Sequence, residues 1–138
     1  MRWHKKVVRA SNLSRGSLIG DRVRVAETGL TRIVGLLGES GLPNGDGLLI
    51  VPSQGVHTFG MRFPIDVAVL DGAWKVIGIN HALGPFRMTR FYWRAAAVLE
   101  LPAGTLNSTS TSVGDFIEFG AVAPASAHAD GPSKDRTV

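Results

Sequence analysis

Hydrophobic and polar residues alternate along several short stretches of this chain, which is the pattern of β-strands with one buried and one exposed face. The alternation is cleanest at residues 18–26, where apolar residues take turns with Arg22 and Arg24. A second strand pattern at residues 5–10 precedes it. The turn-forming residues between the two stretches predict a β-hairpin.

The rest of the pattern predicts more short strands and one helix. Four apolar residues between positions 30 and 37 recur at helical spacing, so we expect an amphipathic helix at residues 29–38 with Thr28 as its N-cap. Further strands are expected at residues 48–52, 56–61, 65–70, 74–80, 95–101 and 113–120. This pattern predicts a mainly β (α+β) fold, a small and compact, mostly antiparallel β-barrel or sandwich with one or two short helices.

One domain accounts for the 138 residues. We expect a β-rich domain at residues 1–120 and a disordered tail at 121–138, which is rich in Ala, Pro and Ser. No apolar run reaches the roughly 18 residues of a membrane span, and no apolar segment follows the basic N-terminus, so we expect a cytoplasmic protein. The chain has no Cys, which excludes disulfides, thiolate catalysis and Cys-ligated zinc.

The charge balance is basic and rests on arginine. The net charge is +4, and 11 of the 15 basic residues are Arg. A guanidinium group can hold phosphate through two hydrogen bonds. The arginines are nevertheless spread along the chain and form no basic helix face, which argues against a DNA-reading protein.

The densest polar group lies in residues 56–71, VHTFGMRFPIDVAVLD, where Asp66 interrupts a strand that is apolar on both faces. A carboxylate in that setting is costly unless it accepts hydrogen bonds or pairs with a cation. In one interpretation, Asp66 locks the start of the strand by accepting backbone N–H bonds. In another, it is a pocket carboxylate with His57, Thr58 and Arg62 nearby. Simple exposure at a strand edge is the third alternative.

A second polar group lies in residues 84–95, GPFRMTRFYWRA, where Arg87, Arg90 and Arg94 are interleaved with four aromatic residues. Arginine and aromatic side chains can stack on bases, hold phosphates or anchor a protein partner. They also form ordinary loops that pack their rings on the end of a barrel. Of the two interpretations, the first makes this segment the best candidate for a ligand or partner surface.

Other chemistry finds little support in the sequence. The four histidines show no metal-ligand spacing, so we expect no metal and no cofactor. Ser53 and Thr58 lie in no nucleophile motif, and the glycine-rich stretches lack the lysine of a phosphate loop. Carboxylates such as Glu100 could pair for acid–base work, but their distances do not follow from the sequence.

Several motifs in order resemble a known family. They are GLLG, LPNGDGLLIVPSQGVHTFGMRFPIDVAVLD, AAAVLELPAG and VGDFIEF, from about residue 20 to 120, and they resemble the bacterial and archaeal family called domain of unknown function 192. The resemblance implies a compact β-rich fold with one or two helices and no established activity. Family members often carry an Arg where this chain has Glu39 and a Cys where it has Ser53, which argues against chemistry at these positions. The polar residues that the chain retains are His57, Thr58, Arg62, Asp66, Glu100 and Asp115.

Three functional hypotheses follow. The first is a non-enzymatic binding or accessory module that holds a small anionic ligand or a protein segment near residues 57–66 and the Arg/aromatic segment, with Glu100 as a further candidate residue. The second is a small hydrolase- or isomerase-like enzyme in which Asp66 is the general base and His57 or Arg62 polarises the substrate. The third, weak binding of nucleic acid or phosphate, rests on charge alone. The sequence leaves the oligomeric state open.

Overall fold

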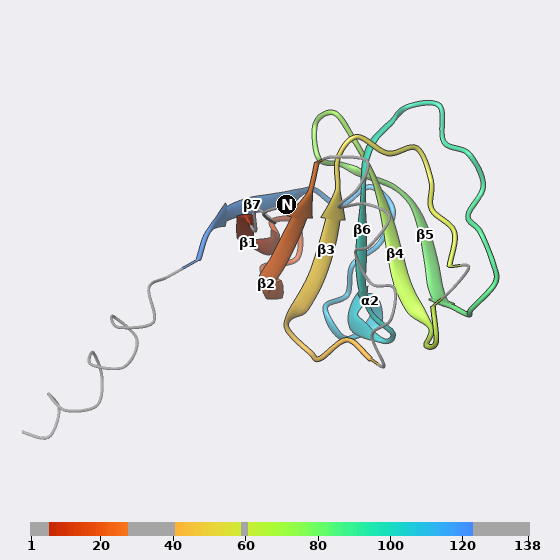
Figure 1. Ribbon diagram of the computed structural model, residues 1–138. Coiled ribbons are helices and arrows are strands. Elements are labelled where there is room, and N and C mark those ends of the chain that lie inside the picture. Colours follow the sequence, from red (N-terminus) through yellow and green to blue (C-terminus); the bar gives the residue numbers. More distant parts are fainter. Residues whose placement is uncertain (1–5, 28–40, 59–60, 123–138) are drawn as a thin grey trace, which may run out of the picture.

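The computed structural model of the chain describes residues 6–27, 41–58 and 61–122, which form a strongly curved β-sheet (Figure 1). The elements are β1 (Lys6–Asn12), β2 (Ser17–Ala26), β3 (Asp46–Ile50), β4 (Ile65–Asp71), β5 (Val76–Leu83), β6 (Ala95–Pro102), helix α2 (Thr105–Ser108) and β7 (Ile117–Ala121). The strand order across the sheet is β5-β4-β6-β3-β2-β1-β7. Only β2 and β3 pair in parallel; the other pairs are antiparallel. The predicted mainly β fold is confirmed.

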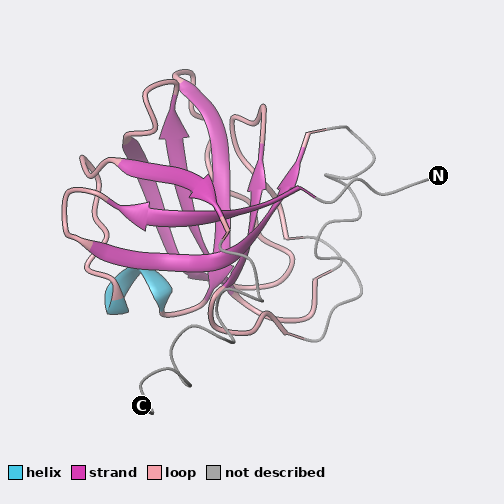
Figure 2. Ribbon diagram, turned by 90° about the vertical axis from the view of Figure 1, so that its left-hand side faces the viewer, coloured by secondary structure: helices cyan, strands magenta, loops and turns pink. Residues whose placement is uncertain are grey.

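The sheet curls into a half-barrel whose two edge strands approach each other at one end (Figure 2). There the Val76 N–H donates to the carbonyl of Asp115 at 2.8 Å, and the Ile117 N–H donates to the carbonyl of Trp74 at 2.9 Å. The Trp74 ring also meets the Phe119 ring edge-on, with centroids 5.1 Å apart. These contacts join the start of β5 to β7 and stabilise the curvature of the sheet.

Apolar side chains fill both faces of the central strands. The inner cluster draws buried residues from all seven strands, among them Val23, Leu70 and Leu99, and from Leu106 of α2. The outer cluster contains Val67 of β4 and neighbouring apolar side chains of β2, β3 and β6, packed with Met61 and Tyr92 from the loops. The central strands are therefore buried on both sides, as their continuous apolar sequences predicted.

Segment 84–94, which connects β5 to β6, is fastened to the outer face through Tyr92. The Tyr92 ring lies so close to Gly78 of β5 that a Cβ at this position would collide with it. Glycine at position 78 therefore permits a close approach of ring and strand. The segment is held against the sheet at this point.

Most of the predicted strands are confirmed. The hairpin of β1 and β2 forms, β4 and β5 are joined at the Asp71-Gly72 turn, and β4 divides its side chains between the two clusters as expected. The last strand is shorter than predicted and begins at Ile117. The predicted helix at residues 29–38 and the tail from residue 123 lie outside the described residues.

The predicted strand at residues 56–61 is wrong for its described part. Only His57 there takes part in a β-bridge, an isolated one with Met88, and Thr58 is buried whereas His57 is exposed. The partners of this segment are loop residues rather than a neighbouring strand, so its apparent alternation did not correspond to a sheet. Helix α2, which the sequence pattern did not predict, has four residues and is far too short to cross a membrane.

Candidate functional site

Two loops on one side of the sheet pair with each other. One is residues 52–58, which follow β3, and the other is residues 84–94, which we call the arm. Their backbones are joined by hydrogen bonds from Thr89 N–H to Val56 O (2.9 Å), from Tyr92 N–H to Gln54 O (2.9 Å) and from Thr58 N–H to Arg87 O (2.8 Å). The arm therefore has a fixed position relative to the facing loop.

Thr58 fastens the base of the arm. Its side chain is fully buried, and its hydroxyl donates to the carbonyl of Gly84 at 2.6 Å and accepts from the Arg87 N–H at 2.9 Å. A hydroxyl with these partners supports the loop rather than contacting a ligand.

A groove lies between the arm and the facing loop. It is lined by residues 52–57 on one side, by residues 88–91 on the other and by Ala95, and its volume is about 930 Å³. That volume is within the range of small-molecule and peptide sites, roughly 300–1,000 Å³. The lining includes His57 and Arg90 but no Asp or Glu.

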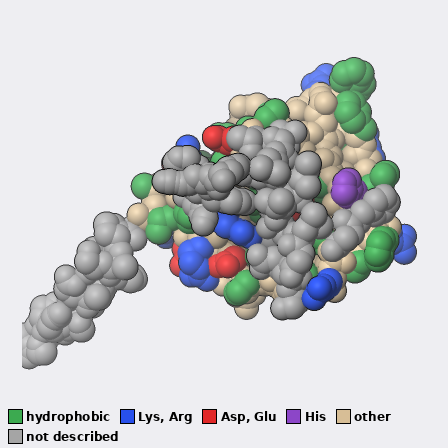
Figure 3. Space-filling model, in the orientation of Figure 1, with side chains coloured by type: hydrophobic (Ala, Val, Ile, Leu, Met, Phe, Trp, Pro, Cys, Tyr) green, Lys and Arg blue, Asp and Glu red, His purple; other side chains and the backbone are tan. Residues whose placement is uncertain are grey.

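Large apolar side chains of the arm are exposed beside this groove. The exposed fractions are 71% for Phe86, 62% for Met88, 56% for Phe91 and 81% for Trp93. The Phe91 and Trp93 rings meet edge-on at 5.4 Å, and the Arg90 guanidinium lies 4.6 Å from the centre of the Tyr92 ring. Figure 3 shows hydrophobic side chains with Lys and Arg along its right-hand edge, the side on which Figure 1 places the arm.

Asp66 lies away from this groove, on the inner face of β4. Its side chain is fully buried, and its two oxygens accept three backbone hydrogen bonds. The donors are Ala82 N–H (2.8 Å) at the end of β5, Gly104 N–H (3.1 Å) at the N-cap of α2 and Leu106 N–H (2.9 Å) within α2. These are the contacts of the interpretation in which Asp66 locks the strand through backbone donors.

The structure thus divides the residues that the sequence singled out. His57 and Arg90 line the groove, and Arg87 and Arg94 are exposed on the same arm. Arg62 is exposed and does not line the groove. Asp66 and Glu100 occupy two other places within the sheet, so the predicted polar group does not converge on one site.

Glu100 lies on the outer face of β6 between Leu48 of β3 and Val67 of β4, its neighbours in the sheet. Its side chain is 4% exposed, and burial raises its pKa from an ordinary 4.5 to about 7. The same row of the sheet continues to Arg24 on β2 and to Asn80 on β5, whose Oδ1 is buried without a hydrogen-bond partner. The outer face therefore carries a buried carboxylate and a buried, unpaired amide oxygen that their apolar neighbours gave no reason to expect.

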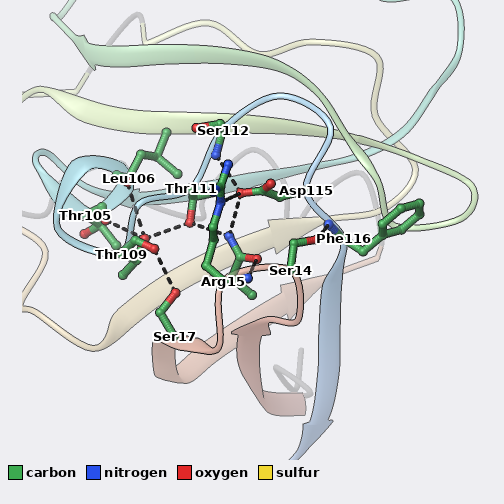
Figure 4. Close-up of polar contacts among 11 residues, drawn as sticks. Ser14, Arg15, Ser17, Thr105, Leu106, Thr109, Thr111, Ser112, Asp115 and Phe116 are labelled. Carbon is green, nitrogen blue, oxygen red and sulfur yellow. Dashed lines mark hydrogen bonds and ion pairs between the residues drawn. The ribbon is translucent and has the colours of Figure 1, made fainter.

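Asp115 belongs to a polar network at the other side of the half-barrel (Figure 4). Its Oδ2 accepts hydrogen bonds from Asn12 (3.0 Å), the Ser112 N–H (2.9 Å) and Arg15 (3.1 Å). Desolvation by burial raises the pKa of Asp115, but these hydrogen bonds and the Arg15 charge outweigh it and lower the pKa. The network ties the β1–β2 turn to the segment before β7 and is structural.

Sequence reasoning missed part of the groove. Residues 52–56 and Met88 line it; they lie within the quoted stretches, but no chemical motif marks them as site residues. The aromatic content of the arm was the one sequence feature that indicated this surface. Within the part of the chain that the structure describes, no three His, Asp or Glu side chains gather in a way that could hold a metal ion.

The Asp66→Asn variant should unfold at a temperature about 10 °C or more below that of the wild-type chain. An amide can accept with only one of its two polar atoms, so at least one of the three buried N–H donors loses its partner, at about 1–3 kcal/mol each. Differential scanning calorimetry measures the difference.

Asp71→Asn, at the other end of the same strand, is the matched control. Asp71 accepts both of its side-chain hydrogen bonds, from Ala73 and Lys75, on Oδ1, which an asparagine can reproduce. Its melting temperature should change by a few degrees at most. Equal melting temperatures for wild type and Asp66→Asn would refute the structural role of Asp66.

Because the pKa of Glu100 is raised in the folded chain, the free energy of unfolding should fall as the pH rises from about 4.5 to about 7. In this window the unfolded chain has released the Glu100 proton while the folded chain retains it, so raising the pH favours unfolding. The shift corresponds to a loss of about 3 kcal/mol by pH 8. Urea unfolding of Glu100→Gln at a series of pH values should lack this component and show a more stable protein at pH 8.

The matched control is Glu118→Gln, which removes an exposed carboxylate on β7. Its free energy of unfolding should depend on pH in the same way as that of the wild type. A Glu100→Gln protein that is less stable than wild type at pH 8 would show instead that the ionised carboxylate is stabilised in the fold.

Comparisons with known proteins agree with this description. The fold is similar to a crystal structure of a protein of unknown function from Novosphingobium aromaticivorans, with a TM-score of 0.71 and 19% identity over 83% of this chain and 84% of that one. It is also similar to a proposed transcription regulator from Sinorhizobium meliloti, with a TM-score of 0.71 and 23% identity over 86% and 96% of the two chains. At these identities the likeness concerns the fold alone.

A protein-family model matches most of the chain. No curated protein sequence matches the chain. The model of domain of unknown function 192 (DUF192), described as "Uncharacterized ACR", matches residues 11–119. This range includes β2 to β6, the groove and Asp66, together with the end of β1 and the start of β7. The chain therefore belongs to the DUF192 family, as its motifs indicated.

Proposed function

We propose that this protein is a non-enzymatic binding module and that its site is the groove between residues 52–57 and the arm. The observation that supports this function is the exposure of Phe86, Met88, Phe91 and Trp93 beside a formed groove. Soluble proteins keep large apolar side chains apart on the surface, and a group of them next to a concavity is typical of an interaction site.

The charges of this surface favour an anionic ligand or protein segment. Arg87, Arg90 and Arg94 are exposed on the arm, and no ion pair with a described residue engages their guanidinium groups. The groove lining adds His57 and contains no Asp or Glu. An anion would therefore meet attraction here without repulsion from a neighbouring carboxylate.

The contacts of Asp66 weaken the enzyme hypothesis. A general base must reach the proton that it removes. Asp66 is fully buried, accepts three backbone N–H bonds and does not line the groove. The hydrogen bonds of Thr58 and Asp66 instead support the chain at the base of the arm.

The dye 8-anilinonaphthalene-1-sulfonate, which combines aromatic rings with one sulfonate group, should bind the folded protein saturably in a fluorescence titration. Phe91→Ala should lower its affinity roughly tenfold, because Phe91 lines the groove and such aromatic contacts are worth about 1–2 kcal/mol.

The matched control is Phe116→Ala, since Phe116 is also exposed but does not line the groove. Its dye affinity should equal that of the wild type, and near-ultraviolet circular dichroism checks that all three proteins are folded. Absent or unsaturable dye binding by wild type, or equal binding by Phe91→Ala, would contradict the proposed site.

A further inference from the structure

We infer that the occupant of the groove is an extended, acidic segment of another protein that places an apolar side chain between the two loops. This inference rests on the proposed function and names the partner of that same site. It is supported by the extent of the exposed apolar surface, by the charges of the arm and by the concave shape between residues 52–57 and residues 88–91.

The apolar surface extends beyond the groove itself. Phe86 and Trp93, the two most exposed aromatic side chains among the described residues, do not line it. A small molecule held between the loops would leave both rings in water. A polypeptide segment running along the arm can cover them together with Met88 and Phe91, and aromatic side chains of this kind contribute most of the affinity at protein interfaces.

The dimensions suit a short extended segment. The facing wall of the groove has six residues, which correspond to at most about 20 Å of extended chain. A partner segment of about six residues in extended conformation matches this length. Its alternate side chains would point toward the groove and away from it.

The charges select an acidic segment. The arm carries three arginines and no Asp or Glu, and residues 52–58 of the facing loop also contain no Asp or Glu. Carboxylates on both sides of the buried apolar side chain would come close to Arg87, Arg90 and Arg94. Arginine forms paired hydrogen bonds with carboxylate groups, so these contacts add direction as well as attraction.

A nucleic acid or an anionic membrane fits the surface less well. Nucleic acids need a continuous basic track, but Arg15 and Arg22 are already paired with Asp115, Asp21 and Asp46. A bilayer is a flat surface and cannot enter a groove. The described structure therefore favours a protein segment.

The experiment selects peptides from a displayed library of random 12-residue sequences on the wild-type protein and removes those that also bind Phe91→Ala. We expect the retained peptides to combine at least two Asp or Glu residues with an aromatic or large aliphatic residue. Fluorescence polarisation of one retained peptide should show binding that weakens roughly fivefold in Arg90→Gln and in Arg94→Gln.

Arg9→Gln, which removes an exposed arginine of β1 away from the groove, should leave the peptide affinity unchanged. The same titrations use vesicles of phosphatidylcholine and phosphatidylglycerol and a 20-nucleotide single strand and duplex, which should bind more weakly than the peptide. Retained peptides without acidic enrichment, or tighter binding of vesicles or oligonucleotides through the arm, would overturn the inference. If the dye still binds in a Phe91-dependent way, the proposed groove survives that result; if the dye does not bind, the proposed function itself fails.

Discussion

The three backbone hydrogen bonds to the Asp66 carboxylate hold together the parts of the fold on which the groove depends. Burying a carboxyl group without hydrogen-bond partners is costly, so the fully buried side chain of Asp66 depends on its three N–H donors. Charge-assisted bonds of this kind contribute about 1.5–3 kcal/mol each, a large part of the 5–15 kcal/mol by which a domain is stable. Two of its donors sit beside backbone in the left-handed region, Ala82 with φ 45° and Gly104 with φ 96°. Asp66 therefore holds the turn at Ala82, whose conformation is unfavourable for a residue other than glycine, and the turn at Gly104, which glycine adopts readily.

This constraint reaches the groove through the chain that follows β5. Ala82, whose N–H donates to Asp66, lies two residues before Gly84, where the arm begins. The Thr58 hydroxyl donates a hydrogen bond to the Gly84 carbonyl and accepts one from the Arg87 N–H. Asp66 and Thr58 thus hold the base of the arm from two sides. Two polar residues of the sequence VHTFGMRFPIDVAVLD, Thr58 and Asp66, thus help to position a loop that exposes several large apolar side chains.

The sequence was sufficient for most of the sheet because the central strands carry a local pattern that matches their environment. Val67 and Val69 on one face of β4, and Ala68 and Leu70 on the other, pack in two separate clusters as their alternation predicted. It failed at residues 56–58 of the predicted strand 56–61, because their partners are about 30 positions away in the arm and pair as loops. The groove could not be predicted for the same reason. The role of Asp66 stayed open because its donors are backbone N–H groups of distant turns, and almost any residue type supplies a backbone N–H. Glu100 shows the opposite case, a carboxylate in an equally apolar strand that accepts no hydrogen bond from a described residue and whose pKa burial raises to about 7.

The arm is an exposed loop, yet it is held at several points, and this rigidity bears on binding. Its backbone pairs with the facing loop, Tyr92 packs on Gly78 of β5, Arg90 lies over the Tyr92 ring, and Phe91 meets Trp93 edge-on. Ordering a loop and its side chains during association costs about 0.5–1.5 kcal/mol for each immobilised side chain. An arm that is already ordered avoids much of that cost, so its exposed aromatic rings are more effective as contacts than the same residues would be in a free segment. Fixed position also distinguishes this surface from a chance cluster of exposed apolar residues, because the interactions that stabilise the arm leave most of the Trp93 side chain exposed.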